Sequence, residues 1–200
     1  SLHIGTYSSI SRKWLPEIIR EFQKDYPSIE IHFKEGGAED ILRWMQRREV
    51  DMGFFSENVD DWYDWIPLTE DPLLAVLPPD SDAPDPMPAA YLSGKAVIIP
   101  DYGTNTDTTR VFTRAGVEPA YTDDRLNNRS VLAAVAAGLG STVFSRLELD
   151  HYAQQNLTVR AIDPPCLREL GVAMRPAVKN NPVARSLLRA LRRAAADDIA

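Results

Sequence analysis

The 200-residue sequence predicts an α/β protein made of two βα lobes, and three observations carry this prediction. Apolar strand patterns alternate with amphipathic helix patterns along the chain, which is typical of parallel sheets with right-handed crossovers. A proline-dense stretch, "PPDSDAPDPMP", interrupts this alternation and indicates an irregular surface connection. The last helix pattern needs an apolar partner, so we expect the chain to return to the first lobe near its end.

The first lobe begins with a strand, "LHIGT", and a helix over residues 13–26 follows, with its apolar residues at helical spacing. The stretch "IEIHFKE" alternates apolar and polar residues, which indicates a half-exposed, edge-like strand with Ile29, Ile31 and Phe33 facing inward. The turn "GGAED" leads into a second helix, and "VDMGFF" is a third strand. The aromatic stretch "DDWYDWIP" is expected to form a surface loop, and stacking of its rings on a base or sugar is the alternative.

The second lobe follows the proline-dense stretch. Its first strand, "AVIIP", is continuously apolar, as a central parallel strand is. The polar loop "DYGTNTD" leads into a helix, and "NNRSVLAAVAAG" is a second helix, begun by Asn128 or Ser130 and stopped by Gly138 or Gly140. Further along, "STVFS", "LTVRAI" and "LGVAMRP" are strands, and "NPVARSLLRALRRAA" is the last helix.

Two segments are expected to cross between the lobes. One lies near Leu74–Pro79 and the other near Cys166–Met174. The first lobe would then be discontinuous, formed by residues 1–75 and 168–200, and the second lobe would comprise residues 76–167.

Composition excludes several functional classes. The formal net charge is −7 and no uninterrupted basic run is present, which argues against a nucleic-acid surface on this chain, since neutralising phosphates requires clustered cations. The lone Cys166 cannot form an internal disulfide, and no apolar run approaches the roughly 20 residues of a membrane span. The first residues lack the basic and apolar regions of a signal peptide. We therefore expect a cytoplasmic protein without membrane contact.

The search for catalytic and metal-binding motifs gives no candidate. The histidines His3, His32 and His151 are scattered and do not have zinc-ligand spacing. The sequence contains no nucleophile elbow, no phosphate-binding P-loop and no dinucleotide-binding glycine motif. We therefore expect neither an enzyme nor a protein with a metal or cofactor.

Small polar residues recur where strands meet helices. They are Ser8, Ser9, Gly36, Gly37, Ser56, Thr104, Asn105, Thr106, Asn128 and Ser145. In open α/β sheets, ligands bind beyond the carboxyl ends of the strands, where helix N-termini present unpaired N–H groups. A cleft lined by such residues suits a small carboxylate or another small anion. Each residue taken singly also suits a plain helix cap, so both interpretations stay open at this point.

Several motifs together resemble the effector-binding domain of LysR-type transcriptional regulators. The resemblance rests on "LHIGTYSSISRKWLPEIIREFQKDYPSIEIHFKEGGAEDILRWMQRREVDMGF", "LLAVLPPDSD" and "VLAAVAAGLGSTVFS". Each motif is a modest signal, but their order and spacing agree over essentially the whole chain. The resemblance implies two Rossmann-like lobes joined by two crossovers, which is the type II periplasmic-binding-protein-like fold, with a small-molecule effector between the lobes.

The resemblance also implies roles for particular residues. Effector contacts fall on the turn after the first strand, on the turn after the second strand, at the end of the third strand and on the loop before the first helix of the second lobe. The matching residues are Ser8, Ser9, Gly37, Phe54, Ser56, Thr104, Asn105 and Thr106. Asn128 and Ser145 complete the candidate ligand-binding set, on the junction pattern alone.

The family's full-length regulators bind DNA through an N-terminal winged helix-turn-helix, which these 200 residues do not contain. We therefore expect this chain to be the sensing part of such a regulator. We expect it to self-associate as a dimer, with the strand at residues 29–34 and the first helix packing against the "SVLAAVAAG" helix of a second copy, and to form a tetramer in the full-length protein. An extracytoplasmic solute-binding protein of a transporter is the alternative function, and an enzyme on the same fold is a third.

Overall fold

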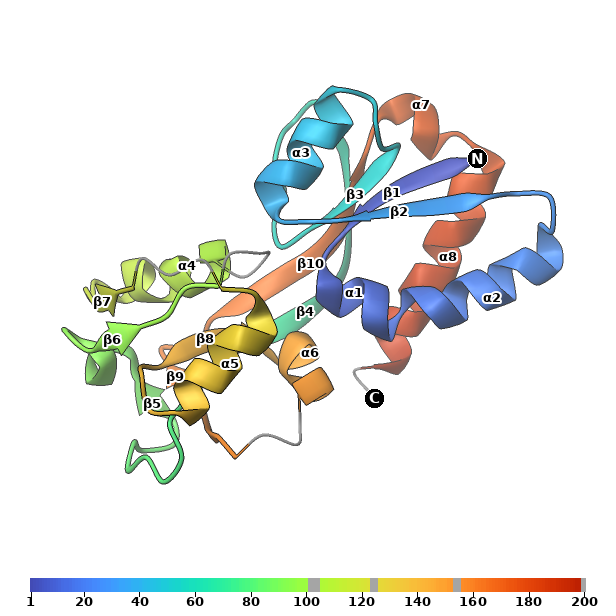
Figure 1. Ribbon diagram of the computed structural model, residues 1–200. Helices are drawn as coiled ribbons and strands as arrows, with labels where there is room; N and C mark the ends of the chain where they lie inside the picture. The colour runs from blue at the N-terminus through green and yellow to red at the C-terminus, as the bar shows by residue number, and fades with distance from the viewer. Residues whose placement is uncertain (101–104, 123–125, 153–155, 199–200) are drawn as a thin grey trace. The chain divides into compact units, whose positions relative to one another are not determined.

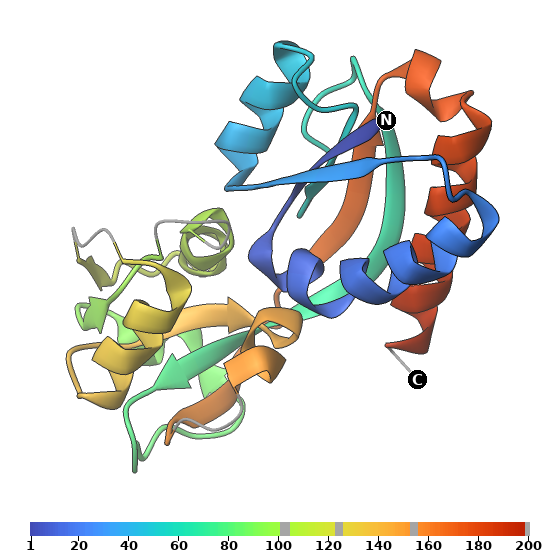
Figure 2. The same cartoon turned by 45° about the vertical axis from the view of Figure 1, so that its right-hand side comes forward.

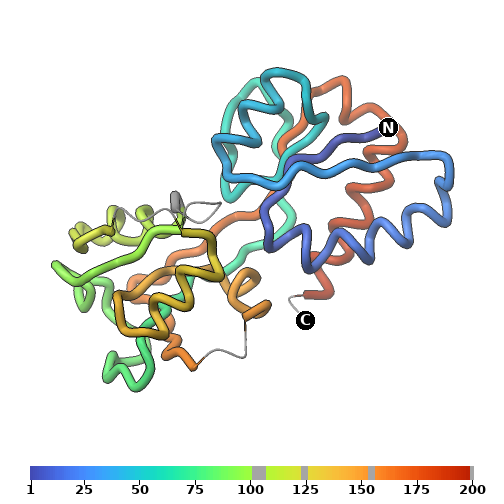
Figure 3. The backbone as a smooth tube through the Cα atoms, in the orientation of Figure 1, coloured from blue at the N-terminus to red at the C-terminus, as the bar shows by residue number. Residues whose placement is uncertain are grey.

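The computed structural model describes the chain except for residues 101–104, 123–125, 153–155 and 199–200, and of Asn105 and Thr106 it describes the backbone. The chain divides into two compact units. Unit 1 comprises Ser1–Glu70 and Glu169–Ala200, and unit 2 comprises Asp71–Arg168. The chain leaves unit 1 within strand β4 (Asp64–Leu77) and returns within strand β10 (Leu167–Met174), and these two strands are neighbours in the sheet (Figure 3). The predicted class, α/β with two crossover segments, is confirmed.

The sheet of unit 1 has the strand order β2-β1-β3-β10-β4. The first three of these strands are β2 (Ile31–Glu35), β1 (Leu2–Thr6) and β3 (Met52–Phe55). Strand β1 is parallel to both β2 and β3, whereas β10 is antiparallel to β3. The parallel β-α-β-α-β order predicted for the beginning of the chain is therefore confirmed.

Helices cover both faces of this sheet (Figures 1 and 2). They are α1 (Ser8–Lys13), α2 (Leu15–Asp25), α3 (Ala38–Gln46), α7 (Pro176–Lys179) and α8 (Pro182–Asp197). Helix α3 packs closely on one face, because a Cβ atom at Gly5 or Gly53 would lie 2.7 or 2.4 Å from Cγ2 of Ile41. Helices α2 and α8 pack against each other on the opposite face.

The helix predicted over residues 13–26 is wrong in its first turn. The chain forms α1, breaks at Trp14 and continues as α2. Pro16 is the second residue of α2 and has no N–H group to donate to the preceding turn, so a single continuous helix would lack a hydrogen bond there.

Three further expectations need correction. Phe33 was expected to face inward, but it is 39% exposed, because β2 is the edge strand of unit 1 and is largely uncovered. The stretch "DDWYDWIP" is only partly a loop, since β4 already begins at Asp64. The stretch "AVIIP" yields only the two-residue strand β6 (Ala96–Val97), although Val97 and Ile98 are buried as expected.

In unit 2, strand β4 pairs on one side with β8 (Thr142–Ser145) and on the other with β9 (Thr158–Asp163), which in turn pairs with β5 (Met87–Pro88). Strands β6 and β7 (Ala120–Tyr121) form a separate pair. The helical elements are α4 (Asn105–Ala115), α5 (Asn128–Ala136), α6 (Arg146–Leu149) and the 3₁₀ turns η1 (Ala89–Leu92) and η2 (Asp150–Tyr152).

The predicted end of the helix α5 is confirmed at Gly138, whose φ of 80° is readily adopted by glycine. Its N-cap is Asn127, whose side chain accepts a hydrogen bond from the N–H of Ser130, rather than Asn128 or Ser130. Across the described part of the chain, every helix is too short or too polar to span a membrane.

Candidate functional site

Three parallel strands of unit 1 end at one edge of its sheet. Thr6 at the end of β1 lies opposite Glu35 at the end of β2, and the N–H of Gly36 donates to the carbonyl of Thr6 at 3.1 Å. Strand β3 runs in the same direction beside β1, so Ser56 follows its carboxyl end at this edge. The structure thus brings together the turns that carry Ser8 and Ser9, Gly37 and Ser56, which is where parallel sheets bind ligands.

Ser8 and Ser9 are the first two residues of α1, and neither occupies its N-cap. The N-cap residue is Tyr7, which makes no side-chain capping hydrogen bond. Ser8 is half-buried, whereas Ser9 is 2% exposed. Both serines also have a hydrogen bond or another polar or electrostatic interaction. The N-cap explanation therefore does not account for this pair of serines.

The turn after β2 is shaped by glycine. Gly37 is the N-cap of α3, and its N–H faces Oδ2 of Asp40 at 3.4 Å. A Cβ atom at Gly36 would lie 2.7 Å from the ring of Trp44, so a glycine allows this close approach. The N–H group of Gly37 thus donates to the Asp40 carboxylate within the turn.

The two candidate residues at the end of β3, Phe54 and Ser56, differ in their surroundings. Phe54 is completely buried and forms part of the hydrophobic core. Ser56 is 9% exposed, and its carbonyl oxygen accepts a hydrogen bond from the N–H of Glu169 at 3.1 Å. Ser56 therefore contacts the first unit 1 residue of the returning strand β10.

The candidates of unit 2 are only partly described. Thr104 lies outside the described residues, and Asn105 and Thr106 are known as the first residues of α4. Asn128 and Ser145, which are distant in sequence, both contact Glu148. The Asn128 amide donates to Oε1 of Glu148 at 2.9 Å, and the Ser145 hydroxyl accepts from the backbone N–H of Glu148 at 3.2 Å.

These contacts indicate different roles for Ser145 and Asn128. Ser145 is completely buried and is the N-cap of α6, so the cap interpretation holds for it. Asn128 is 7% exposed, and its Oδ1 atom has no hydrogen-bond partner among the described residues. Asn128 thus retains a buried acceptor.

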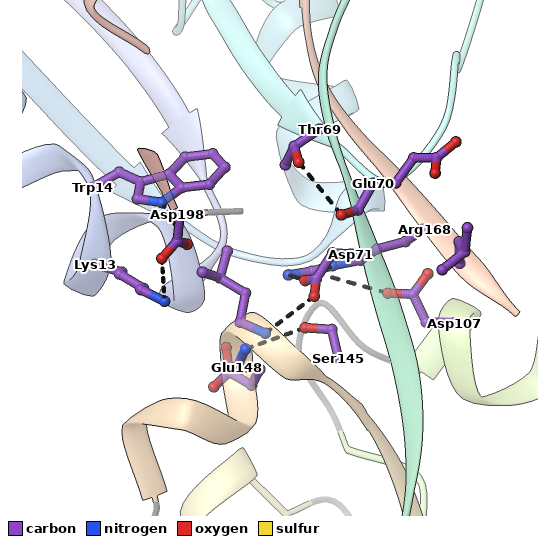
Figure 4. A network of polar contacts seen from close by, with 12 residues as sticks. Lys13, Trp14, Thr69, Glu70, Asp71, Asp107, Ser145, Glu148, Arg168 and Asp198 are labelled. Atoms are coloured by element: carbon purple, nitrogen blue, oxygen red, sulfur yellow. Dashed lines mark hydrogen bonds and ion pairs between the residues drawn. The ribbon is translucent and has the colours of Figure 1, made fainter. Parts of the chain in front are cut away.

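A buried network of charged residues in unit 2 was not predicted from the sequence (Figure 4). The Nε and Nη2 atoms of Arg168 each lie 2.8 Å from Oδ2 of Asp71, and its Nη1 atom lies 3.9 Å from Oδ2 of Asp107. Arg110 donates to the other carboxylate oxygen of Asp107 at 3.1 Å. The remaining oxygen of Asp71 accepts a hydrogen bond from the N–H of Leu147 at 3.1 Å. The network contains two acids and two arginines, so its charges balance.

This network joins the elements of unit 2 that surround the start of α4. Asp71 belongs to β4, Arg168 to β10 and Asp107 to the first turn of α4. The hydroxyl of Thr108 in the next position donates to the carbonyl of Val143 in β8 at 3.2 Å. The start of α4 is therefore fixed by buried polar contacts to two neighbouring strands. The strand sequences of Asp71 and Arg168 also contain the charged residues Glu70 and Glu169, so no sequence signal distinguished this pair.

The described residues contain no group of three or more His, Cys, Asp or Glu side chains that could hold a metal ion. Two carboxylates, Glu35 and Asp40, lie at the unit 1 edge and accept hydrogen bonds from the Ser11 hydroxyl and the Gly37 N–H. The candidate residues at this edge supply hydroxyls and backbone N–H groups. Such groups can donate hydrogen bonds to a small anionic or polar molecule.

Comparison with known proteins decides the family. The sequence pattern described as the LysR substrate binding domain matches residues 1–196. This chain belongs to that family. It is 26% identical over 192 residues to a Bacillus subtilis protein described as the uncharacterized HTH-type transcriptional regulator YvbU, over 94% of this chain and 64% of that protein. It is 25% identical over 201 residues to the HTH-type transcriptional regulator CbbR of Rhodospirillum rubrum, over 98% of this chain and 66% of that protein.

Solved structures of the family share the fold. The regulatory domain of CcmR from Synechocystis PCC6803, solved in complex with 2-PG, superposes with a TM-score of 0.84 at 25% identity. The superposition covers 96% of this chain and 95% of that one. The LysR substrate binding domain described here thus matches about two thirds of the length of its regulator relatives and nearly all of an isolated regulatory domain. These relatives do not favour a transporter's solute-binding protein.

Proposed function

We propose that this chain is the effector-sensing domain of a LysR-type transcriptional regulator. The observation that carries the proposal is the family match over residues 1–196. The named relatives are HTH-type transcriptional regulators, and the CcmR domain shows that a similar domain is found with a small molecule, 2-PG. We propose that this domain likewise binds one small molecule as its signal and has no catalytic role.

The proposed effector contacts come from both units. In unit 1 they are Ser8, Ser9, Ser56 and the turn at Gly37, which share one sheet edge. In unit 2 they are the residues around the start of α4, Thr104–Thr106, whose helix is anchored by Asp107 and Thr108. Hydroxyl and N–H donors favour a small molecule with a carboxylate or another anionic group.

Binding would regulate transcription by shifting the equilibrium between two conformations of the domain. A ligand can shift such an equilibrium only by its difference in affinity for the two conformations. The full-length regulator would transmit this shift through its oligomer to N-terminal winged helix-turn-helix domains, which bind the DNA. This role implies that the protein works in the cytoplasm, where bacterial DNA lies.

The proposed dimer uses the uncovered edge of unit 1. Strand β2 exposes Phe33, and all but the first of its five residues are exposed. An exposed edge strand with an apolar side chain is a site at which another chain tends to pair. We propose that β2 and α2 pack against α5 of a second copy, and that the full-length protein is a tetramer.

Native mass spectrometry of the purified chain tests the proposed function. We expect a small molecule that is released on denaturation, and we expect this compound to raise the melting temperature of the ligand-free chain, because a ligand of the folded state stabilises it. If no small molecule co-purifies, and if the small-molecule fraction of a bacterial extract also leaves the melting temperature unchanged, the proposal is contradicted.

A further inference from the structure

The outer face of α8 carries an arginine stripe, which we define as Arg185, Arg189 and Arg192. These residues recur at intervals of four and three, so they lie on one side of the helix, and all are exposed. Leu187, Leu188, Leu191 and the other buried residues of α8 occupy the adjoining side of the helix. Within the described parts of the chain, the three guanidinium groups make no hydrogen bond or ion pair.

Arg193 lies at the margin of this stripe. It borders a groove of about 610 Å³ between α2 and α8, which is also lined by the acids Glu17, Glu21 and Asp25. Arg193 pairs with none of these acids within 4.0 Å. The hydrogen bond from Lys24 instead holds the pKa of Glu21 below its ordinary value. The acids of this groove therefore do not neutralise the arginines, which form a positive patch on a chain with a net charge of −7.

A second unexplained feature of unit 1 is an acidic tryptophan turn, which we define as Asp60, Asp61 and Trp62. Trp62 is 82% exposed, more than any other large hydrophobic residue that the structure describes. The carboxylate of Asp60 accepts the N–H of Trp62 at 3.0 Å, and neither acid pairs with a cation in the described residues. A largely exposed indole beside two acids is unusual on a surface that contacts only water.

The stripe and the turn both belong to unit 1. The turn leads directly into Asp64, which forms an ion pair with Lys179 of α7 at 3.0 Å. Helix α8 begins three residues after Lys179. Among the described residues, no ion pair joins the positive stripe to the negative turn within one chain.

We propose that the arginine stripe binds the acidic tryptophan turn of a second copy of this chain. Two patches of opposite charge on one chain suit a two-fold axis, because each copy can then offer its stripe to the turn of the other. Arginine fits this role better than lysine, since a guanidinium binds a carboxylate through two hydrogen bonds and stacks on an indole face. All four basic residues of α8 are arginines.

This contact is separate from the dimer proposed through β2, α2 and α5, and it does not depend on the effector. Exposed ion pairs each contribute only about 0–1 kcal/mol, so we expect a weak and salt-sensitive association that adds a second interface to an assembly. A nucleic-acid backbone is the other possible partner for arginines. The net charge of −7 opposes it, and it leaves the exposed Trp62 without a role.

Charge reversal tests the proposal by sedimentation velocity at high protein concentration and low salt. One variant carries Asp60→Lys and Asp61→Lys, and the other carries Arg185→Glu and Arg189→Glu. We expect each variant alone to lose the association by at least about tenfold, because like charges then meet. An equimolar mixture should restore it, since each stripe again faces a turn of opposite charge. Arg47→Glu, at an exposed arginine on α3, is the matched control and should leave the association unchanged.

The outcomes separate the alternatives. Unchanged sedimentation of both variants, or a mixture that stays dissociated while both variants keep the wild-type melting temperature, overturns the proposal. So does binding of a short duplex DNA by the wild-type chain that Arg185→Glu with Arg189→Glu abolishes. The neutral pair Arg185→Gln and Arg189→Gln, expected to weaken the association less, replaces the reversed pair if that variant does not fold. The shift in melting temperature that the effector causes should be equal in all variants. A negative result for this self-association can therefore be distinguished from a negative result for effector sensing.

Discussion

The guanidinium group of Arg168 lies 2.8 Å from the carboxylate of Asp71, and the two residues are 1% and 5% exposed. Asp71 is the first residue of unit 2 on the outgoing strand β4, and Arg168 is its last residue on the returning strand β10. The ion pair therefore links the two crossover strands at the boundary of unit 2. Through Asp107 it also reaches the first turn of α4, beside the proposed effector contacts Thr104–Thr106.

Removing one member of this pair should strongly destabilise the protein. Asp71→Ala removes the nearest carboxylate from the buried charge of Arg168, and such changes cost about 3–5 kcal/mol. The measurement is urea unfolding at neutral pH. Lys179→Met, which breaks the exposed pair with Asp64, is the control and should cost no more than about 1 kcal/mol. Equal losses in the two variants would show that burial of the Arg168 pair has no energetic importance.

Gly171 should not tolerate a larger residue. A Cβ atom there would lie 2.5 Å from the ring of Trp65 and 2.7 Å from the carbonyl oxygen of Ile66. Because a backbone atom on the neighbouring strand cannot move freely, we expect Gly171→Ala to lower the free energy of unfolding by about 1–3 kcal/mol. The comparison is Gly36→Ala, whose nearest contact is the outer edge of the Trp44 ring, a side chain that can shift. A smaller loss at Gly171 than at Gly36 would contradict this explanation.

Ser145 should behave as a helix cap. Its hydroxyl accepts the N–H of Glu148 in a completely buried position. We expect Ser145→Ala to cost about 1 kcal/mol of stability and to lower the melting temperature equally with and without effector. Thermal melts in both conditions check this. A change confined to the liganded protein would instead make Ser145 an effector contact.

Phe33 should contribute to self-association. It is 39% exposed on the edge strand β2, so a change to lysine removes no core contact and places a charge on the proposed dimer surface. We expect Phe33→Lys to shift the chain from dimer to monomer in light scattering at micromolar concentration, with an unchanged melting temperature of the monomer. A wild-type chain that is monomeric at high micromolar concentration would refute the proposed dimer.

The sequence predicts the order of the elements better than their pairing. The parallel start of the chain and the last helix α8 were predicted because apolar residues recur at strand and helix spacing. The same signal fails at "AVIIP". Val97 and Ile98 are buried, yet the strand is two residues long, because burial does not specify hydrogen-bond partners.

The candidate site was predictable only in part. The turns of Ser8, Gly37 and Ser56 share one edge because parallel strands end together, which follows from element order. The Asp71–Arg168–Asp107 network was missed, because its members are far apart in sequence and no local pattern pairs them. Ser145 as a cap and Phe54 as a core residue likewise depend on contacts that only the structure supplies.

The most direct test of the account measures effector affinity in Ser8→Ala and Thr104→Ala by titration calorimetry, using the compound identified by native mass spectrometry. The account holds that these hydroxyls bind the effector, one from each unit. Loss of a hydrogen-bond donor to the bound effector should then weaken binding by about 5- to 150-fold, which corresponds to about 1–3 kcal/mol, while the melting temperature without effector changes little. Unchanged affinity in both variants, with or without a lower melting temperature, would contradict the account.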